Sequence, residues 1–234
     1  EKIIETPFNN NKIRIGVPEE YFEPGLCPEI KEKINQLLDA LSNDGFCVTK
    51  INLPHTCYGI ATYYILATAE ASTNLARFDG VRFGYRSPHA KTIFELYTNS
   101  RGEGFGQEVK RRIILGTFVL SSGYYEAYYL KAQKVRSLIM KDFDDAFKSV
   151  DFIVTPTTPE PAFKLGEKSA DRLKMYLSDI FTVNANLAGI PGINLPIGFS
   201  SDKLPIGVQI LAPAFKEGDL LRFAYYIEQN ITRE

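Results

Sequence analysis

The stretch KIRIGVPEEYFEPGLCPEIKEKINQLLDALSNDGFCVTKINL (residues 12–53) decides the fold. Residues 12–17 alternate along the chain and are rich in β-branched side chains, which predicts a strand. Pro28 begins a predicted helix whose apolar residues fall on one stripe, and Gly45 ends it. Residues 47–53 predict a second strand. Because the two strands and their helix take only about 40 residues, they form a βαβ crossover with parallel strands.

The rest of the chain continues with helices and strands. Residues 151–156 (DFIVTP) are a short apolar run that predicts a strand buried on both faces. Residues 192–199 and 205–212 predict two strands with a hairpin-length connection. Helices are predicted over residues 57–78, 107–148, 171–188 and 217–230, with a short helix near 91–97. The fold class is therefore α/β, a mixed β-sheet covered by helices, and residues 1–234 are expected to form a single domain.

Composition narrows the class of protein. The 234 residues are 44% hydrophobic and 24% charged, which is typical of a soluble globular protein. The net charge of −1 gives no overall basic field, so a partner or a local patch has to do most of any RNA binding. Three cysteines at wide spacings predict free, buried or half-buried thiols. No apolar stretch is long enough to span a bilayer, and residues 1–10 lack the pattern of a signal peptide.

Several short motifs carry little chemistry. His55 and His89 lie beside prolines and predict surface residues rather than members of a Ser-His-Asp site. RGEGFG (101–106) has no strand before it and no phosphate-loop lysine, so it predicts a flexible loop before a helix. No run has the ligand spacing of a metal site. No cofactor is therefore expected in this chain.

The densest functional signal is EVKRRIILGTFVLSSGYYEAYYLKAQKVR (residues 108–136), a helical stretch with an expected kink or break at Gly123. Arg112 follows Glu108 by one turn, so an ion pair along the helix is one interpretation. The other is a guanidinium that grips a carboxylate through two parallel hydrogen bonds. Adjacent helical residues point about 100° apart, so only one of Arg111 and Arg112 can face a pocket.

Two groups of tyrosines lie on predicted helices. The first group is Tyr124, Tyr125, Tyr128 and Tyr129, and the second is Tyr63 and Tyr64. Tyrosines at i,i+4 spacing are typical of core and interface packing, with each hydroxyl finding a partner. Packing is therefore the interpretation that the residues alone favour.

Asp179 lies among largely apolar neighbours in MYLSDIFTVNANLAG (175–189). Such a carboxylate either faces solvent on an amphipathic helix or is a desolvated partner for a cation. Asn184 and Asn186 either cap helices or cross-link loops. The residues alone leave both pairs of interpretations open.

Three segments carry a resemblance to a known family: NLARFDGVRFGYRS (74–87), residues 108–136, and NLAGIPGINLPIGF (186–199). Together they resemble the A subunits of glutamyl-tRNA(Gln) amidotransferases, which are amidase-signature enzymes, and the resemblance covers essentially the whole chain. It implies an amidase-signature mixed sheet with helices on both faces. It also implies an incomplete fold, the C-terminal half of the family's chain, because the glycine- and serine-rich segment with the nucleophile is not among these residues.

The resemblance implies a reaction shared among several polypeptides. In the family a Ser–cis-Ser–Lys triad hydrolyses free glutamine, and the ammonia travels to a partner that uses ATP and Mg²⁺ to amidate the glutamate on Glu-tRNA(Gln). The implied partners are the B and C subunits, with tRNA contacted through the former and no membrane. The implied location is a bacterial cytoplasm or the matrix or stroma of an organelle. The triad belongs to the absent half, so this chain is expected to hold no catalytic residue and to be inactive alone.

The resemblance also implies three glutamine-binding residues, Tyr63, Arg112 and Asp179. Free glutamine is a zwitterion, so a guanidinium suits its α-carboxylate and a carboxylate suits its α-ammonium group. Holding both ends positions the side-chain amide at one distance from the nucleophile. Arg111 is the alternative to Arg112, and Tyr64 the alternative to Tyr63.

Two other functions stay open. A different amidase-signature hydrolase of simple amides would not need an Arg112–Asp179 pair matched to an amino acid, so the two side chains need not face one cavity. A non-catalytic, truncated interaction module that binds partner subunits would expose a large apolar face where the missing half would dock.

Overall fold

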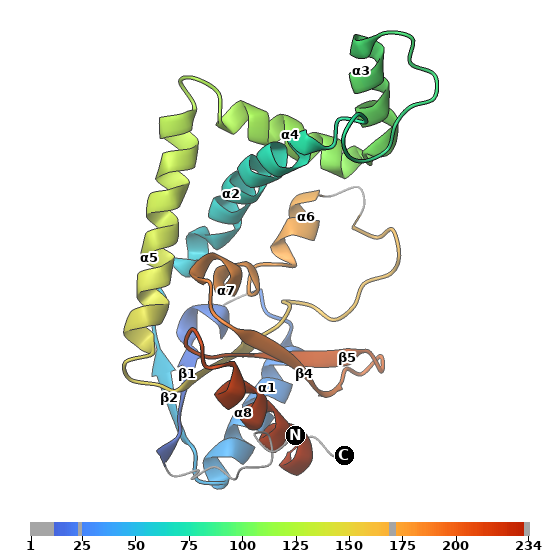
Figure 1. Cartoon of the computed structure of the whole chain (residues 1–234). Helices are drawn as coiled ribbons and strands as arrows, with labels where there is room; N and C mark the ends of the chain where they lie inside the picture. Colours follow the sequence, from blue (N-terminus) through green and yellow to red (C-terminus); the bar gives the residue numbers. More distant parts are fainter. Residues whose placement is uncertain (1–11, 23–24, 169–171, 232–234) are drawn as a thin grey trace. The chain divides into compact units, whose positions relative to one another are not determined.

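The structure, a computed structural model, describes residues 12–22, 25–168 and 172–231, with 172–174 described by their backbone alone (Figure 1). Residues 1–10, for which the sequence predicts no signal peptide, lie outside the described residues. The chain falls into two compact units, unit 1 with Glu1–Ile60 and Arg136–Glu234, and unit 2 with Ala61–Val135. The expectation of a single domain stays a prediction.

Unit 1 is built on a five-stranded sheet in the order β2-β1-β3-β5-β4. The strands are β1 (Arg14–Pro18), β2 (Cys47–Ile51), β3 (Phe152–Pro156), β4 (Gly192–Phe199) and β5 (Pro205–Leu211). β1 is parallel to β2 and β3, and α1 (Pro28–Asn43) makes the crossover between β1 and β2. β5 is antiparallel to β3 and β4. The βαβ unit, the hairpin and the mixed sheet are confirmed.

Helices cover both faces of this sheet (Figure 1). α1 and α8 (Glu217–Asn230) lie on one side, and their apolar side chains form one buried cluster with β1, β3 and β5. The predicted stripe on α1 is confirmed, since its buried residues are Ile30, Ile34, Leu37, Leu38 and Leu41. On the other side lies α7 (Val183–Ala188), and Gln209 of β5 donates to the carbonyl of Phe181 at 3.1 Å. β3 is buried along its whole length, as predicted.

The single helix predicted over residues 171–188 is wrong. The described chain forms α6 (Arg172–Leu177), a turn over 178–182, and α7, while residue 171 lies outside the described residues. Asn184 and Asn186 each donate to the carbonyl four residues earlier, at 3.2 and 2.9 Å. Side chains that bond the local backbone in this way compete with a continuous helix.

Unit 2 consists of helices and loops, and its described residues contain no strand. Its helices α2 (Gly59–Asn74) and α4 (Gln107–Val119) cross closely at Gly116, because a Cβ there would lie 1.9 Å from the carbonyl oxygen of Thr68. Glycine thus allows two helix backbones to touch. A larger residue at this position would push the two helices apart.

One prediction for unit 2 needs correction, and another is confirmed. The short helix near residues 91–97 extends to Gly104 as α3 (Ile93–Gly104), so the first four residues of RGEGFG are helical rather than a loop. The helix predicted over 107–148 is interrupted at Gly123, as expected, where φ is +85°. A π-helical turn, η5 (Tyr125–Leu130), and α5 (Lys131–Ala146) follow the interruption.

The tyrosines after this break do not form a core. Tyr124, Tyr125 and Tyr128 are 42%, 40% and 41% exposed, so core packing is wrong for these three. Their rings lie against neighbouring rings of the same segment, with centroids 5.8 Å apart for Tyr124–Tyr128 and 5.2 Å apart for Tyr125–Tyr129. The segment therefore presents an aromatic surface.

Two further findings concern membrane-spanning helices and the cysteines. None of the helices in the described ranges is long and apolar enough to cross a membrane. Cys27, Cys47 and Cys57 are free thiols, and Cys47 and Cys57 are exposed rather than buried or half-buried.

Candidate functional site

Arg112 lies on α4 in unit 2, beside its alternative Arg111. Arg112 Nε donates to Oε1 of Glu108 at 3.3 Å, and Arg111 Nη1 donates to the other oxygen of the same carboxylate. The ion pair along the helix is therefore present for both arginines. Within the described part of unit 2, the Nη atoms of Arg112 make no other hydrogen bond, and its side chain is 42% exposed. The outer edge of this guanidinium thus has donors for a further carboxylate.

Tyr63 and its alternative Tyr64 lie on α2. Their rings meet edge to face, with centroids 5.2 Å apart and planes 82° apart, and both residues are half-buried. α2 and α4 are the two helices that cross at Gly116. Tyr63 and Arg112 are therefore positioned by one helix pair.

Asp179 lies in unit 1, in the turn between α6 and α7, and the residue is exposed. Its carbonyl accepts the backbone N–H groups of Thr182 and Val183 at 3.0 and 3.1 Å, and the hydroxyl of Thr182 at 3.1 Å. These bonds fix the backbone from which the carboxylate projects. The residue faces solvent, as one of the two interpretations has it, but it lies on a turn rather than on a helix.

A buried polar cluster anchors the chain just after this turn. Asn184, 1% exposed, donates to the hydroxyl of Tyr21 at 2.8 Å, and the Tyr21 ring lies 5.0 Å from that of Phe181. A Cβ on Gly59 would lie 2.0 Å from Oδ1 of Asn184, so only glycine fits there. Burial raises the pKa of Tyr21, so its hydroxyl stays protonated at neutral pH. The cross-linking interpretation of Asn184 is confirmed.

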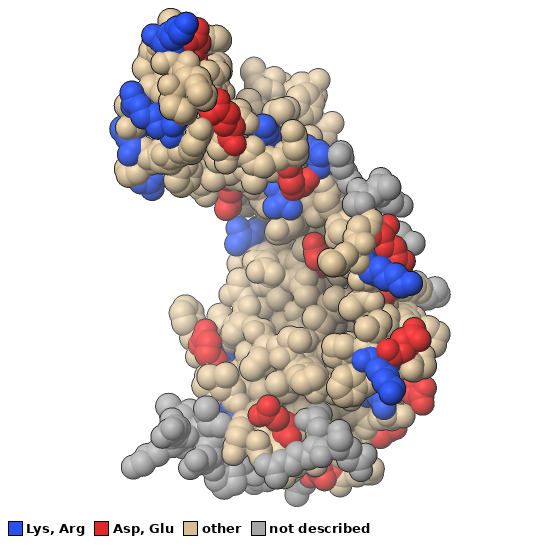
Figure 2. All heavy atoms as spheres, turned by 90° about the vertical axis from the view of Figure 1, so that its right-hand side faces the viewer, with Lys and Arg blue, Asp and Glu red and all other residues tan. Residues whose placement is uncertain are grey.

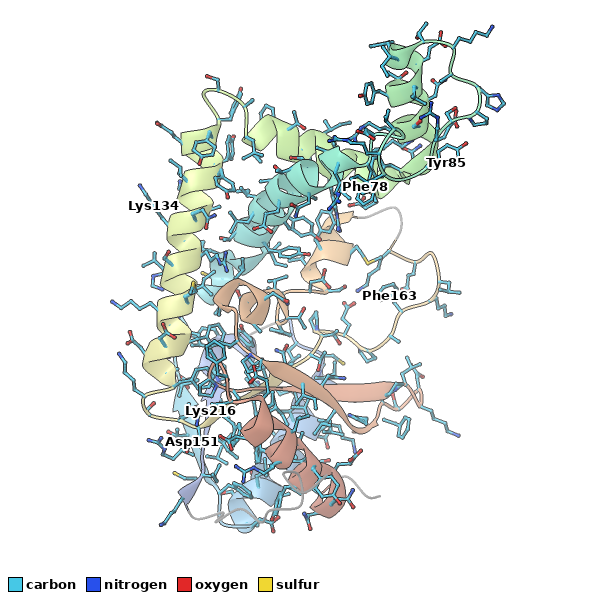
Figure 3. All side chains as sticks on the ribbon, viewed as in Figure 1. Phe78, Tyr85, Lys134, Asp151, Phe163 and Lys216 are labelled. Atoms are coloured by element: carbon cyan, nitrogen blue, oxygen red, sulfur yellow. The ribbon has the colours of Figure 1, made fainter. Side chains whose placement is uncertain are left out.

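A cavity of about 620 Å³ opens in unit 1 beside the Asp179 turn, and Leu177, Ser178 and Ile180 line it. Lys168 also lines it and is 5% exposed. Its Nζ lies 2.8 Å from Oε2 of Glu160, 2.9 Å from Oγ of Ser178 and 4.4 Å from the centroid of Phe163, whose place on the preceding loop Figure 3 shows. Sequence reasoning missed Lys168, because lysines are mostly exposed and nothing in its neighbours marks this one as buried.

The motif NLARFDGVRFGYRS forms the connection from α2 toward α3 in unit 2, where Figure 3 labels Phe78 and Tyr85. The Asp79 carboxylate accepts the backbone N–H groups of Arg82 and Val81 at 3.0 and 2.8 Å. These bonds, the one from Arg82 first, lower the pKa of Asp79 to about 2. The ionised carboxylate thus holds a tight loop whose aromatic residues are exposed.

The histidine prediction needs a correction at one position. His55 is half-buried rather than a plain surface residue, and Nδ1 of its ring lies 2.8 Å from Oδ1 of Asp142. The backbone N–H of His55 donates to Oδ2 of the same carboxylate at 2.7 Å. Searched across the described ranges, the side chains of His, Cys, Asp and Glu form no group of three that could hold a metal ion.

The structure thus places the three predicted site residues on two different units. Tyr63 and Arg112 lie in unit 2, and Asp179 lies in unit 1. That Arg112 and Asp179 face one cavity stays a prediction.

Known proteins resemble this chain along nearly its whole length. A family model described as Amidase matches residues 4–221. The chain is 60% identical over 219 residues to the A subunit of the glutamyl-tRNA(Gln) amidotransferase of Koribacter versatilis, and 56% identical over 218 residues to that of Thermodesulfovibrio yellowstonii. These alignments cover 94% and 93% of this chain but 46% and 45% of the relatives. The chain therefore spans about half the length of the curated relatives it matches.

Solved structures share the fold. The crystal structure of the A subunit of the glutamyl-tRNA(Gln) amidotransferase from Thermotoga maritima superposes with a TM-score of 0.72 at 40% identity, over 94% of this chain and 43% of that chain. A crystal structure of an amidase, 22% identical, superposes with a TM-score of 0.71 over 97% of this chain and 47% of that chain. At this lower identity the likeness concerns the fold alone. Together with the mixed sheet of unit 1, these matches show that the chain belongs to the amidase family.

Proposed function

We propose that this chain is the glutamine-binding part of the A subunit of a tRNA-dependent amidotransferase. In the completed enzyme glutamine is hydrolysed, and the ammonia passes to the B and C subunits, where ATP and Mg²⁺ drive the conversion of Glu-tRNA(Gln) to Gln-tRNA(Gln). The tRNA is bound through the B subunit, in a bacterial cytoplasm or in an organelle. The observation that carries the proposal is identity of 60% and 56% to proteins named as A subunits, along 94% and 93% of this chain.

The chemistry of the predicted residues supports glutamine as the ligand. The outer nitrogens of Arg112 bind the α-carboxylate in a forked pair, and the Asp179 carboxylate binds the α-ammonium group. The Tyr63 hydroxyl adds a donor or acceptor from the helix that crosses α4. Gripping both charged groups leaves the side-chain amide of glutamine at a fixed distance from the reacting atoms.

Catalysis is proposed to require residues that this chain does not supply. The nucleophile, the base and the oxyanion donors come from the remaining half of the subunit, as the resemblance implies. A bound glutamine without these groups has no covalent route to hydrolysis. The chain alone is therefore proposed to bind the substrate and to release no ammonia from it.

The test is a chimera in which residues 1–234 replace the matching part of the Koribacter versatilis A subunit, co-expressed with that organism's B and C subunits. Ammonia release from glutamine is measured at a series of concentrations. Arg112→Lys keeps the charge but loses the forked geometry, so kcat/KM falls about 10- to 100-fold. Asp179→Asn loses the charge that holds the α-ammonium group and gives a fall of similar size.

Matched controls come from neighbouring residues. Arg111→Lys changes the same helix and the same ion pair with Glu108, and is expected to change kcat/KM by less than about threefold. Tyr64→Phe is likewise the matched control for Tyr63→Phe. An unchanged kcat/KM for Arg112→Lys would remove this residue from the pocket. Equal rates with propionamide and glutamine would favour a hydrolase of simple amides.

A further inference from the structure

Lys168 is buried at the end of a loop that is otherwise exposed. Residues 162–167 are all exposed, whereas Lys168 is 5% exposed. Figure 2 views the side on which this loop lies in Figure 1, and shows acidic and basic side chains close together on the surface, where water and salt screen their charges. A lysine is rarely buried, because its ammonium group loses water and has to be met by partners of the protein. The role of Lys168 therefore depends on which groups it joins.

The partners of Lys168 come from two segments that are separate in the chain. Its Nζ lies 2.8 Å from Oε2 of Glu160, on the loop that follows β3, and donates to Oγ of Ser178 at 2.9 Å. The ring of Phe163, on the same loop as Glu160, has its centroid 4.4 Å from this Nζ. Ser178 directly precedes Asp179 in the turn between α6 and α7. One ammonium group thus joins the loop after β3 to the turn that carries Asp179.

The turn has a polar anchor on each side of Asp179. After it, the buried side chain of Asn184 donates to the hydroxyl of Tyr21 at 2.8 Å. Before it, Ser178 accepts from Lys168. The cavity of about 620 Å³ lies beside the same turn, so packing within the described part of unit 1 does not fill that side. Since close packing is what ordinarily fixes a buried segment, the position of this turn depends on its two anchors.

We infer that Lys168 positions the Asp179 carboxylate, and thereby sets the preference of the enzyme for amides that carry an α-ammonium group. The inference rests on the proposed function, in which Asp179 binds that group of glutamine. Lys168 does not bind the substrate in this scheme, because Glu160, Ser178 and the ring of Phe163 already meet its ammonium group. Without that group the turn loses one anchor, and the carboxylate is less often in the place where it binds the substrate.

A role in folding alone predicts a different pattern of activity. A lysine that only stabilised unit 1 would affect the hydrolysis of all amides alike. A misplaced Asp179 carboxylate affects only those amides that carry the group it binds. Glutaramate is glutamine without the α-amino group, and it keeps the carboxylate and the side-chain amide. A comparison of glutamine with glutaramate therefore separates positioning from folding.

The chimera with the B and C subunits is assayed with both amides. Lys168→Met keeps the length of the side chain and removes the ammonium group. The kcat/KM for glutamine is expected to fall about tenfold, mainly through a higher KM, while that for glutaramate changes by less than about twofold. Lys164→Met, on the exposed part of the same loop, is the matched control and is expected to leave both values unchanged.

A second variant removes the same anchor without leaving Glu160 buried against an apolar side chain. Ser178→Ala takes away the oxygen that Lys168 meets on the turn and keeps the pair of Lys168 with Glu160. The same selective loss on glutamine is expected, and this variant decides the test if Lys168→Met does not fold. In a chain that already has Asp179→Asn, Lys168→Met is expected to add less than about twofold, because the carboxylate that it positions is gone.

The outcomes separate this inference from the proposed function. Equal losses on glutamine and glutaramate, or a loss that persists in full beside Asp179→Asn, would overturn the positioning role of Lys168. A loss with Asp179→Asn but none with Lys168→Met or Ser178→Ala would overturn it too, and would leave glutamine binding by Asp179 intact. An unchanged kcat/KM for Asp179→Asn itself would contradict the proposed function, and the inference with it.

Discussion

Each of the two units of this chain is stabilised internally in its own way. Unit 1 has a sheet whose apolar residues form one continuous cluster with α1 and α8. Unit 2 has few large buried apolar side chains among its described residues, and relies on the close crossing at Gly116 and on polar contacts such as those of Asp79. Each unit carries one charged residue of the proposed glutamine site. The comparison teaches that the chain after Asp179 is anchored by the buried bond from Asn184 to Tyr21, and that Arg112 lies on a helix pair with little core beneath it.

The largest expected effect is in the core of unit 1. Phe223 is fully buried, and its ring lies 4.4 Å from that of Phe152 and 5.5 Å from that of Phe46. Phe223→Ala removes these contacts and leaves a cavity, which lowers the free energy of unfolding by about 3–5 kcal/mol. Denaturant titration followed by circular dichroism measures the change. Phe215→Ala, at a residue 93% exposed, is the control and stays within about 0.5 kcal/mol of the unmodified chain.

In unit 2 the corresponding test is the helix crossing. A Cβ at Gly116 would lie 1.9 Å from a backbone oxygen of α2, so Gly116→Ala forces α2 and α4 apart. The free energy of unfolding of unit 2 is expected to fall by about 1–3 kcal/mol. Gly102→Ala, in α3, meets no atom within 4 Å and gains helix propensity of up to about 1 kcal/mol. Hydrogen exchange of the α2 amides reports both changes. If Gly116→Ala and Gly102→Ala changed the exchange of the α2 amides equally, the crossing would not be what holds unit 2 together.

The Asp179 turn gives a smaller effect and links the core to the site. Asn184→Ala leaves the buried hydroxyl of Tyr21 without the amide donor at 2.8 Å. The free energy of unfolding is expected to fall by about 1–2 kcal/mol as a result. Asn186→Ala removes a bond of the same kind, to the carbonyl of Thr182 at 2.9 Å, but from an exposed residue. This control is expected to cost less than about 0.5 kcal/mol. Thermal unfolding of the two variants side by side tests whether burial makes the difference.

The same contrast shows how far the sequence can be interpreted. In unit 1 the fold follows from periodicity and turn residues, so the stripe on α1, the apolar run of β3 and the β4–β5 hairpin could be predicted. The break in the helix predicted over residues 171–188 could not be predicted, because the chain after the break is anchored by a bond from Asn184 to Tyr21, which lies 163 positions away in sequence. Periodicity does not report a contact of that range.

For the site, residue types could be predicted but their surroundings could not. The resemblance selects Tyr63, Arg112 and Asp179, and spacing alone predicts the ion pair of Arg112 with Glu108. The burial of Lys168 could not be predicted, because it depends on Glu160 and Ser178 meeting its ammonium group in space. Core packing was wrong for the exposed Tyr124, Tyr125 and Tyr128, and i,i+4 spacing did not indicate the π-helical turn that begins at Tyr125.

The smallest effect is a dependence on pH confined to unit 2. Asp79 has its pKa lowered to about 2, from an ordinary value of 3.8, by the N–H groups of Arg82 and Val81. A carboxyl group with a lowered pKa stabilises the folded state when ionised, so its contribution is complete above pH 3.8 and is lost as the pH falls toward 2. The loop of residues 79–82 is therefore expected to exchange its amides faster at a pH of about 2.5 than the intrinsic rate change explains.

Asp79→Asn is the variant that sharpens this last comparison. An asparagine oxygen still accepts the two backbone N–H groups, but it does not titrate, so the acid-induced opening of the loop disappears. Asp39→Asn, on α1 in unit 1, is the control for removing one carboxylate. An opening that persists in Asp79→Asn would mean that acid acts elsewhere in unit 2. The loop would then be held by the contacts of Tyr85 and Ser87 with Glu103, at 2.8 and 3.1 Å, and the carboxylate of Asp79 would be one bond among several.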